Sequence, residues 1–533
     1  MSADFDVLII GGGHNGLVCA AYLARSGRRV LVLERRHVLG GAAVSEEVFP
    51  GFRFSVCSYV VSLLRPDIIR DLELSRFGLD ILPLDGTFSP LPGGDYLWRS
   101  SDHDRTRREI ARHSPIDAEA YDDYARRLLA MARFVKPLVD MTPPDPLSTR
   151  PRDLLALARL ASRFRALDPR DRRTLVQLMT MSAVEFLEQW FSSDALKATM
   201  AASGIIGTFL GVRSPGTAYV LLHHYMGEID GEFRAWGLPS GGTGSISLAI
   251  ARSAESAGAT LRTNVPVAKI LVEGGRATGV VLNNGDEIRA PVVVSGLDPR
   301  QTFERLVGTD HLPADFAADL GRYRYRGSSG KVNLALDALP DFTALPGPGT
   351  HLRGAISISP GVDYLERAYD DAKYGRFSHR PYIDIVIPTL SDPGMAPPGK
   401  HVMSCFVQYA PYTLADGGDW DAERDAFGET VLDTLAEHAP NIRSIVLHRQ
   451  VLTPLDLERE FGLSEGNIFH GELALEQLFF LRPVPGWARH RSPVTNLFLC
   501  GSSTHPGGGI MGASGRNAAR AILADRPLTS RRT

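Results

Sequence analysis

A glycine-rich segment near the start of the sequence carries its clearest chemical signal. Residues 6–36 read DVLIIGGGHNGLVCAAYLARSGRRVLVLERR, with Gly11, Gly13 and Gly16 spaced as G-x-G-x-x-G. In this pattern the first glycine permits a tight turn, the second lets the backbone approach a pyrophosphate, and the third lets a helix pack against a strand. The amides of the helix N-terminus then face the phosphates. The segment therefore predicts a dinucleotide-binding turn.

An acidic residue follows this turn at the distance that dinucleotide sites use. Glu34 lies 21 residues after Gly13, at the end of a predicted strand, where its carboxylate can accept hydrogen bonds from a ribose diol. An acid at this place argues against a 2′-phosphate, although Arg35 and Arg36 weaken that inference. Glycines alone also fit an ordinary turn, but the order of strand, glycines, helix, strand and acid favours a dinucleotide. The motif leaves NAD and FAD open.

Hydrophobic patterns predict the elements that position these residues. Residues 6–10 and 30–33 read as buried strands and residues 17–25 as a helix, which together make a βαβ unit. From about Asp71 to Glu232 the pattern becomes helical, with a loop at Met141–Pro151. The chain therefore leaves the first unit for a helical block.

Strand and turn signals return after residue 237. A glycine-rich turn precedes a predicted helix at Ser245–Ser256, and the last segment predicts a strand, a glycine-rich loop and a helix. Residues 301–490 mix helix and strand patterns. We expect short strands at Ala268–Val272, Ala277–Leu282 and Val292–Val294.

Composition excludes several classes of function. The net charge is −3, without a basic tract, so we expect no nucleic-acid partner. The four cysteines are scattered, with no C-x-x-C pair and no His/Cys cluster, so disulfide chemistry and a metal site are not expected. No basic region followed by a cleavage site opens the sequence, and no run reaches the roughly 20 apolar residues of a spanning helix. We expect a cytoplasmic protein; peripheral contact with a membrane stays open.

Three segments resemble a family of FAD enzymes. HVLGGAA at residues 37–43 resembles the continuation of the first motif in the flavoproteins that include phytoene desaturases and monoamine oxidases. Residues 239–270 are similar to the second FAD segment of that family, and residues 496–519 are similar to the C-terminal signature of bacterial-type carotenoid desaturases. This resemblance implies FAD as the cofactor.

The resemblance also implies which residues hold the cofactor. It places the second glycine pair and the glycine-rich turn of residues 240–244 near the flavin, and it gives Val267 backbone contacts to adenine. It brings the C-terminal loop to the pyrophosphate, ribityl and pyrimidine groups. The expected cofactor contacts are Gly11, Gly13, His14, Gly16, Glu34, Arg35, Gly40, Gly41, Val267, Gly501, Ser502, Gly509, Ile510 and Met511.

The order of these segments predicts the architecture. We expect an α/β protein whose Rossmann-like FAD-binding domain is discontinuous, built from residues 1–70, 235–300 and 491–533. Residues 71–234 and 301–490 would form a mixed α+β substrate domain. The active site is expected between the two.

Three side chains are candidates for catalysis. Lys331, in GSSGKVNLALD, matches by local pattern the lysine that flavin amine oxidases hold near flavin N5, although an exposed strand lysine fits the pattern equally well. His505 lies in the C-terminal glycine loop, and His470 lies in GNIFHGE. Each histidine could equally be structural.

The family's reaction suggests the function. We expect an FAD-dependent oxidoreductase that dehydrogenates C–C bonds of a lipophilic, isoprenoid or carotenoid-like substrate by hydride transfer to flavin N5, with oxygen or a quinone as electron acceptor. Amine oxidation is disfavoured because the aromatic cage residue of amine oxidases aligns with Gly509. The sequence also leaves open a redox-neutral isomerase that uses reduced FAD, and a non-catalytic, regulatory FAD protein. It does not indicate an oligomeric state.

Overall fold

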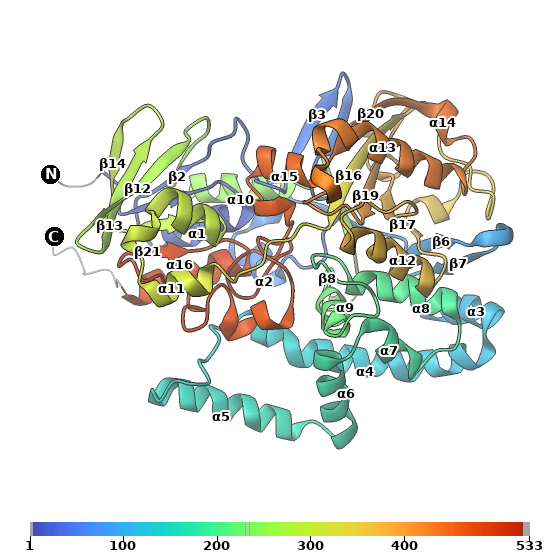
Figure 1. Cartoon of the computed structure of the whole chain (residues 1–533), viewed down its shortest axis with the longest axis horizontal. Coiled ribbons are helices and arrows are strands. Elements are labelled where there is room, and N and C mark those ends of the chain that lie inside the picture. Colours follow the sequence, from blue (N-terminus) through green and yellow to red (C-terminus); the bar gives the residue numbers. More distant parts are fainter. Residues whose placement is uncertain (1–3, 230, 234, 526–533) are drawn as a thin grey trace.

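The computed structural model describes residues 4–229, 231–233 and 235–525 (Figure 1). Two sheets organise the chain. A five-stranded sheet lies at the left of Figure 1 and a seven-stranded sheet at the right, with helices gathered below the second sheet.

The five-stranded sheet is parallel and draws its strands from three distant parts of the chain. Its strand order is β11-β2-β1-β15-β21. Four of the strands are completely buried, because helices pack on one face of the sheet and residues 270–320 pack on the other. The strands are β1 (Val7–Ile10), β2 (Val30–Leu33), β11 (Thr260–Arg262), β15 (Val293–Ser295) and β21 (Leu497–Leu499).

Helices α1 (His14–Arg25), α10 (Gly244–Ser256) and α16 (Ala513–Asp525) pack together against this sheet. Helix α1 begins three residues before the predicted start, because Gly13 takes an extended conformation and its carbonyl accepts the first helical hydrogen bond. Helix α16 approaches α1 so closely that a Cβ at residue 515 would lie 2.1 Å from the Asn15 carbonyl oxygen. Glycine is therefore required at this crossing.

A smaller sheet flanks the parallel one, and a hairpin packs against the seven-stranded sheet. Strands β12, β13 and β14 form an antiparallel sheet close to the boundaries predicted for the first two, and β3 and β4 form a hairpin after the first βαβ unit. Their bounds are β3 (Ser45–Phe49), β4 (Phe52–Ser55), β12 (Val267–Glu273), β13 (Arg276–Leu282) and β14 (Glu287–Arg289).

The seven-stranded sheet forms the second half of the molecule, in the order β20-β16-β19-β18-β17-β6-β7. Strands β6 and β7, which end the sheet on one side, come from a stretch whose pattern predicts helix, so the block after Asp71 is not helical throughout. The strands are β6 (Thr87–Pro90), β7 (Tyr96–Arg99), β16 (Ser329–Leu336), β17 (Ala355–Ile358), β18 (Tyr382–Val386), β19 (His401–Gln408) and β20 (Val446–Leu452).

The helical block starts at residue 103, and polar caps define many of its helices. Side chains of Asp102, Ser114, Asp168, Ser182 and Ser193 each accept a backbone N–H in the first turn of the helix that follows. The helices are α3 (His103–His113), α4 (Pro115–Val139), α5 (Pro151–Ala166), α6 (Pro169–Thr180), α7 (Ala183–Glu188), α8 (Asp194–Ala201) and α9 (Thr217–Tyr225).

The remaining elements pack around the two large sheets or join them. The predicted loop at Met141–Pro151 falls between α4 and α5. Across the described ranges, no helix combines the length and apolarity that crossing a bilayer requires. These elements are α2 (Pro66–Asp71), β5 (Ile81–Pro83), β8 (Glu228–Ile229), β9 (Glu232–Phe233), β10 (Gly237–Pro239), α11 (Ala314–Leu320), α12 (Val362–Lys373), α13 (Trp420–Ala436), α14 (Ile442–Ile445) and α15 (Pro454–Phe461).

Candidate functional site

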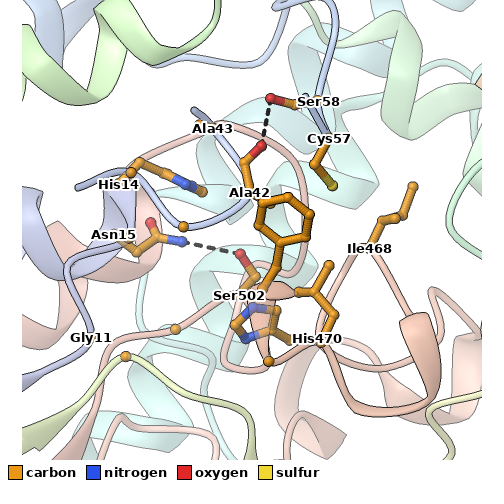
Figure 2. Close-up of a pocket in the computed structure, with 18 of the residues that line it drawn as sticks. Gly11, His14, Asn15, Ala42, Ala43, Cys57, Ser58, Ile468, His470 and Ser502 are labelled. Atoms are coloured by element: carbon orange, nitrogen blue, oxygen red, sulfur yellow. Dashed lines mark hydrogen bonds between the residues drawn. The ribbon is translucent and has the colours of Figure 1, made fainter. Parts of the chain in front are cut away.

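One cavity of about 660 Å³ collects most of the predicted site residues. Its walls come from the turn between β1 and α1, the segment after β2, the start of β12, the strand β16 and the loop after β21. Figure 2 shows His14, Asn15, Ser502 and His470 around this space. Parts of the chain separated by hundreds of residues therefore share one site.

The first glycine motif has the geometry of a phosphate cradle. Gly11 has φ +94°, which favours glycine, and a Cβ on Gly16 would lie 2.3 Å from the Gly11 carbonyl oxygen. A Cβ on Gly13 would instead meet no atom within 4 Å, because it would enter the cavity. The N-terminus of α1 opens on the same space, so its amides can face a pyrophosphate.

Glu34 is buried beside this cradle. Its two carboxylate oxygens accept the backbone N–H groups of Gly12 and Arg36, each at 2.8 Å. These bonds hold the carboxylate at the cavity wall, where a ribose diol could reach its remaining lone pairs. Arg35 also lines the cavity, and its guanidinium donates to the carbonyls of Arg459 and Glu460 on α15.

The second glycine pair, Gly40 and Gly41, packs against the first glycine motif. The Gly40 N–H donates to the Gly12 carbonyl at 2.9 Å, and a Cβ on Gly41 would lie 3.2 Å from the Gly13 Cα. Both glycines line the cavity. Their close approach explains why side chains are missing here.

The C-terminal loop supplies the opposite wall. Asn15 on α1 donates from Nδ2 to Ser502 Oγ at 3.1 Å, which ties this loop to the first glycine motif (Figure 2). The predicted cofactor contacts in the later parts of the chain that also line the cavity are Val267, Gly501, Ser502, Gly509 and Ile510.

Three expectations about the glycine-rich loops differ from the structure. His505 does not line the cavity, because its imidazole is buried against helix α4 and its Nε2 lies 2.7 Å from the Leu138 carbonyl oxygen. Met511 packs its side chain into the helical core instead. The turn of residues 240–244 lies behind the wall, where Thr243 and Gly244 donate backbone N–H groups to serine side chains of the β3–β4 hairpin.

Two histidines face the cavity in their neutral form. Burial, together with the nearby His470, lowers the pKa of His14 to about 4. Burial, together with the positive charge of Arg482, also lowers the pKa of His470 to about 4. His14 Nε2 and His470 Nδ1 are buried without a hydrogen-bond partner. Such orphaned polar atoms at a cavity wall fit a polar ligand that completes their hydrogen bonds.

Lys331 points inward from β16, as its resemblance to the amine oxidase lysine implies. The side chain is 2% exposed, and Nζ donates to the carbonyls of Ser55 at 2.5 Å and Ser58 at 3.1 Å. Burial lowers the pKa of Lys331 to about 7. The lysine therefore changes protonation state near neutral pH, which suits a proton acceptor.

Aromatic residues form much of the wall near Lys331, and sequence patterns did not single them out. Tyr59 stacks on Phe406 with ring centroids 5.7 Å apart, and Lys331 Nζ lies 5.6 Å from the centre of the Tyr59 ring. Tyr59 donates its hydroxyl to Asp384 at 2.5 Å. Trp236 and Phe469 also line the cavity. These residues belong to separate elements, so no local motif could have indicated them.

Arg482 is a further residue that motif analysis missed. Its guanidinium is completely buried and makes six hydrogen bonds to five backbone carbonyls. Two of these hydrogen bonds reach the Ser502 carbonyl in the loop after β21. Others reach the carbonyls of Phe469 and Gly471, on either side of His470. One cation thus joins two walls of the cavity.

Filling the cradle at Gly13 tests its role. The residue has φ −66°, so Gly13→Val needs no strained backbone, but the new side chain occupies cavity space. Overpacking of about 1–3 kcal/mol predicts about tenfold to a hundredfold weaker FAD binding. Flavin content and FAD titration of the apoprotein measure this. Gly321→Val, at an exposed helix end with φ −64°, is the matched control. Equal FAD affinity in both variants would contradict the cradle.

The lowered pKa of Lys331 predicts how stability depends on pH. The folded apoprotein binds this proton less tightly than the unfolded chain, whose lysine has the ordinary pKa of 10.5. The contribution of Lys331 to stability is therefore flat below pH 7 and rises above it, by up to about 1.4 kcal/mol per pH unit, until both states are neutral. Lys331→Met should lose this rise.

Urea unfolding of the wild type and of Lys331→Met, at pH values below and above 7, measures how the difference in their free energies of unfolding depends on pH. Lys269→Met, at an exposed lysine on β12, should follow the wild type. If the difference in the free energy of unfolding between the wild type and Lys331→Met does not change with pH, a buried lysine with this pKa is ruled out.

Comparisons with known proteins agree with the cavity. The chain is 42% identical to pyridine nucleotide-disulfide oxidoreductase domain-containing protein 2 of Rattus norvegicus, over 98% of this chain and 94% of the relative. It is 27% identical to a limonene dehydrogenase subunit of Castellaniella defragrans, over 98% and 95%. It is 26% identical to the neurosporene-forming phytoene desaturase of Cereibacter sphaeroides, over 100% and 97%.

A solved structure shows the same fold. Putrescine oxidase bound to putrescine aligns with 98% of this chain and 98% of its own, with a TM-score of 0.60 at 16% identity. The model of the family described as flavin containing amine oxidoreductase matches residues 16–523. The match includes the whole seven-stranded sheet and the cavity-lining residues from Gly16 onward, and it begins after β1 and the turn that carries Gly11 and Gly13. The chain belongs to the flavin containing amine oxidoreductase family, and it is an FAD-dependent oxidoreductase.

Proposed function

We propose that the protein dehydrogenates a C–C bond of a lipophilic, isoprenoid-like substrate bound against the aromatic wall of the cavity. The observation that carries this proposal is the chemistry of the lining near Lys331. Tyr59 and Phe406 supply aromatic surface there, Trp236 and Phe469 add aromatic surface elsewhere in the lining, and Gly509 adds no side chain. A large apolar molecule fits such a wall.

The hydrogen bonds of the carboxylates that line the cavity are evidence for an uncharged substrate. Among the described residues, Glu34 and Glu458 are the carboxylates that line it. Glu34 accepts two backbone N–H groups, and the oxygens of Glu458 accept the Tyr412 hydroxyl and the Glu465 N–H. Within the described lining, a protonated amine would therefore find only carboxylates that already accept hydrogen bonds from the chain. This disfavours amine oxidation.

Relatives add support from their names. One relative is named as a limonene dehydrogenase subunit and another as a phytoene desaturase, and both names specify an isoprenoid substrate. The putrescine oxidase structure is a fold neighbour at 16% identity, so its amine substrate does not transfer to this chain.

The chain's own residues would divide the work of the reaction. Bound FAD supplies a two-electron acceptor for the hydride that leaves one carbon. A proton must leave the neighbouring carbon as the double bond forms. Neutral Lys331 donates its two hydrogens to the Ser55 and Ser58 carbonyls and keeps one lone pair, which can take that proton directly or through a water. Oxygen or a quinone then removes the two electrons.

The glycine turn, Glu34 and the C-terminal loop would hold the cofactor, with Gly13 leaving room for its phosphates. Orphaned His14 Nε2 and His470 Nδ1 would donate to or accept from its polar atoms. Because both imidazoles are neutral at physiological pH, they add hydrogen bonds without adding charge to an apolar substrate site.

Product analysis with the purified holoprotein tests this function. A long-chain isoprenoid in detergent micelles should yield a product two hydrogen atoms lighter, with equimolar consumption of oxygen or of a soluble quinone. A product of unchanged mass without acceptor consumption would identify an isomerase. Peroxide release from primary amines, with none from the isoprenoid, would identify an amine oxidase.

A wall variant links that activity to this cavity. Phe406→Ala removes apolar contact worth about 1.5–3 kcal/mol, so kcat/KM for the isoprenoid should fall by about tenfold or more. Tyr374→Ala, at an aromatic that is 69% exposed, should leave it unchanged. If the two substitutions lower kcat/KM equally, the aromatic wall does not bind the substrate.

A further inference from the structure

Helix α5 (Pro151–Ala166) stands apart from the body of the molecule at the bottom of Figure 1. Only Asp153 is buried among its sixteen residues. Leu154 and Leu155 are each 52% exposed, and Leu147 in the preceding loop is 91% exposed. Among the described residues none covers these leucines, and exposed apolar side chains gathered on one element are typical of a surface that contacts a partner.

The same segment is strongly basic. Residues 150–173 contain eight arginines and three aspartates, whereas the whole chain has a net charge of −3. Asp153 pairs with Arg489, and Asp168 caps helix α6 by accepting two backbone N–H groups. These partners occupy two of the three carboxylates. The arginines therefore leave a local excess of positive charge.

The two faces of α5 have different roles. Leu157, Leu160 and Phe164 turn toward the molecule and are half-buried, and the last two pack against the helical core. The opposite face carries exposed Arg152, Arg159 and Arg165 beside Leu154 and Leu155. One face thus tethers the helix, and the other presents leucines among arginines to the surroundings.

We propose that α5 docks the protein on the surface of an anionic lipid bilayer. An exposed helix with this pattern can lie in the interface plane, with leucines at the acyl boundary and arginines at the lipid phosphates. A second copy of this chain is a poorer occupant for that face. A two-fold dimer would bring the same arginines toward each other and place like charges in contact.

Vesicle binding of the purified holoprotein tests the proposal. The protein should co-sediment with vesicles of phosphatidylcholine and phosphatidylglycerol and bind pure phosphatidylcholine at least about tenfold more weakly. Added salt should weaken binding to the anionic vesicles because it screens the arginines. Equal binding to both vesicle types, or to neither, would overturn the proposal.

Matched charge variants locate the surface. The triple variant Arg152→Gln/Arg159→Gln/Arg165→Gln should bind anionic vesicles at least about tenfold more weakly than wild type. Arg53→Gln/Arg108→Gln/Arg353→Gln changes the same charge at exposed arginines elsewhere and should bind within about twofold of wild type. Equal loss in both would show general electrostatic attraction, which contradicts docking through α5.

A variant of the exposed leucines distinguishes docking on lipid from binding of a second copy of the chain. Leu154→Ser/Leu155→Ser should weaken vesicle binding and leave the oligomeric state unchanged in light scattering. If it instead dissociates a dimer while vesicle binding persists, a second copy covers α5 and the lipid proposal fails. Because all the substituted side chains are exposed, unchanged flavin absorbance and thermal unfolding should accompany each variant.

Discussion

The site depends on one buried cation. Arg482 has no solvent exposure and, within the described part of the chain, no ion-pair partner, yet its guanidinium remains charged and must satisfy its five N–H groups. Backbone carbonyls do this, and they come from the loop around His470 and from Ser502 of the cofactor loop. Because losing any carbonyl would strand a buried charge, the two loops must hold fixed positions relative to each other. Two walls of the cavity are thereby built as one unit.

Burial reduces the charge of three other basic side chains that line the cavity, His14, His470 and Lys331. Burial lowers the pKa of His14 and His470 to about 4 and that of Lys331 to about 7. At neutral pH the histidines are uncharged, and the lysine is close to its midpoint. Together with the stacked Tyr59 and Phe406, this leaves a surface suited to an apolar molecule, with one group able to exchange a proton. Charge is thus kept where it fastens loops and reduced where an apolar substrate would bind.

Local signals were enough to predict the cofactor end of the site. Gly11, Gly13, Gly16 and Glu34 act within one βαβ unit, so their spacing alone indicates the turn and the acid that face the cavity. Lys331 needed the family resemblance, because an alternating strand does not say which face is buried. His505 and Met511 share their glycine loop with cavity residues but turn away from it, since a loop's side-chain directions depend on what packs against it. Arg482 could not be predicted, because its partners are backbone carbonyls brought together only by the fold.

Anaerobic mixing of the oxidised holoprotein with a candidate substrate, followed by flavin absorbance, isolates the half-reaction in this cavity from any electron acceptor. If Lys331 and the aromatic wall serve C–C dehydrogenation, a long-chain isoprenoid should bleach the flavin, a primary amine should not, and the isoprenoid rate should fall as Lys331 becomes protonated below about pH 7. Bleaching by the amine alone, or a flavin that no isoprenoid reduces while dithionite does, would contradict that assignment.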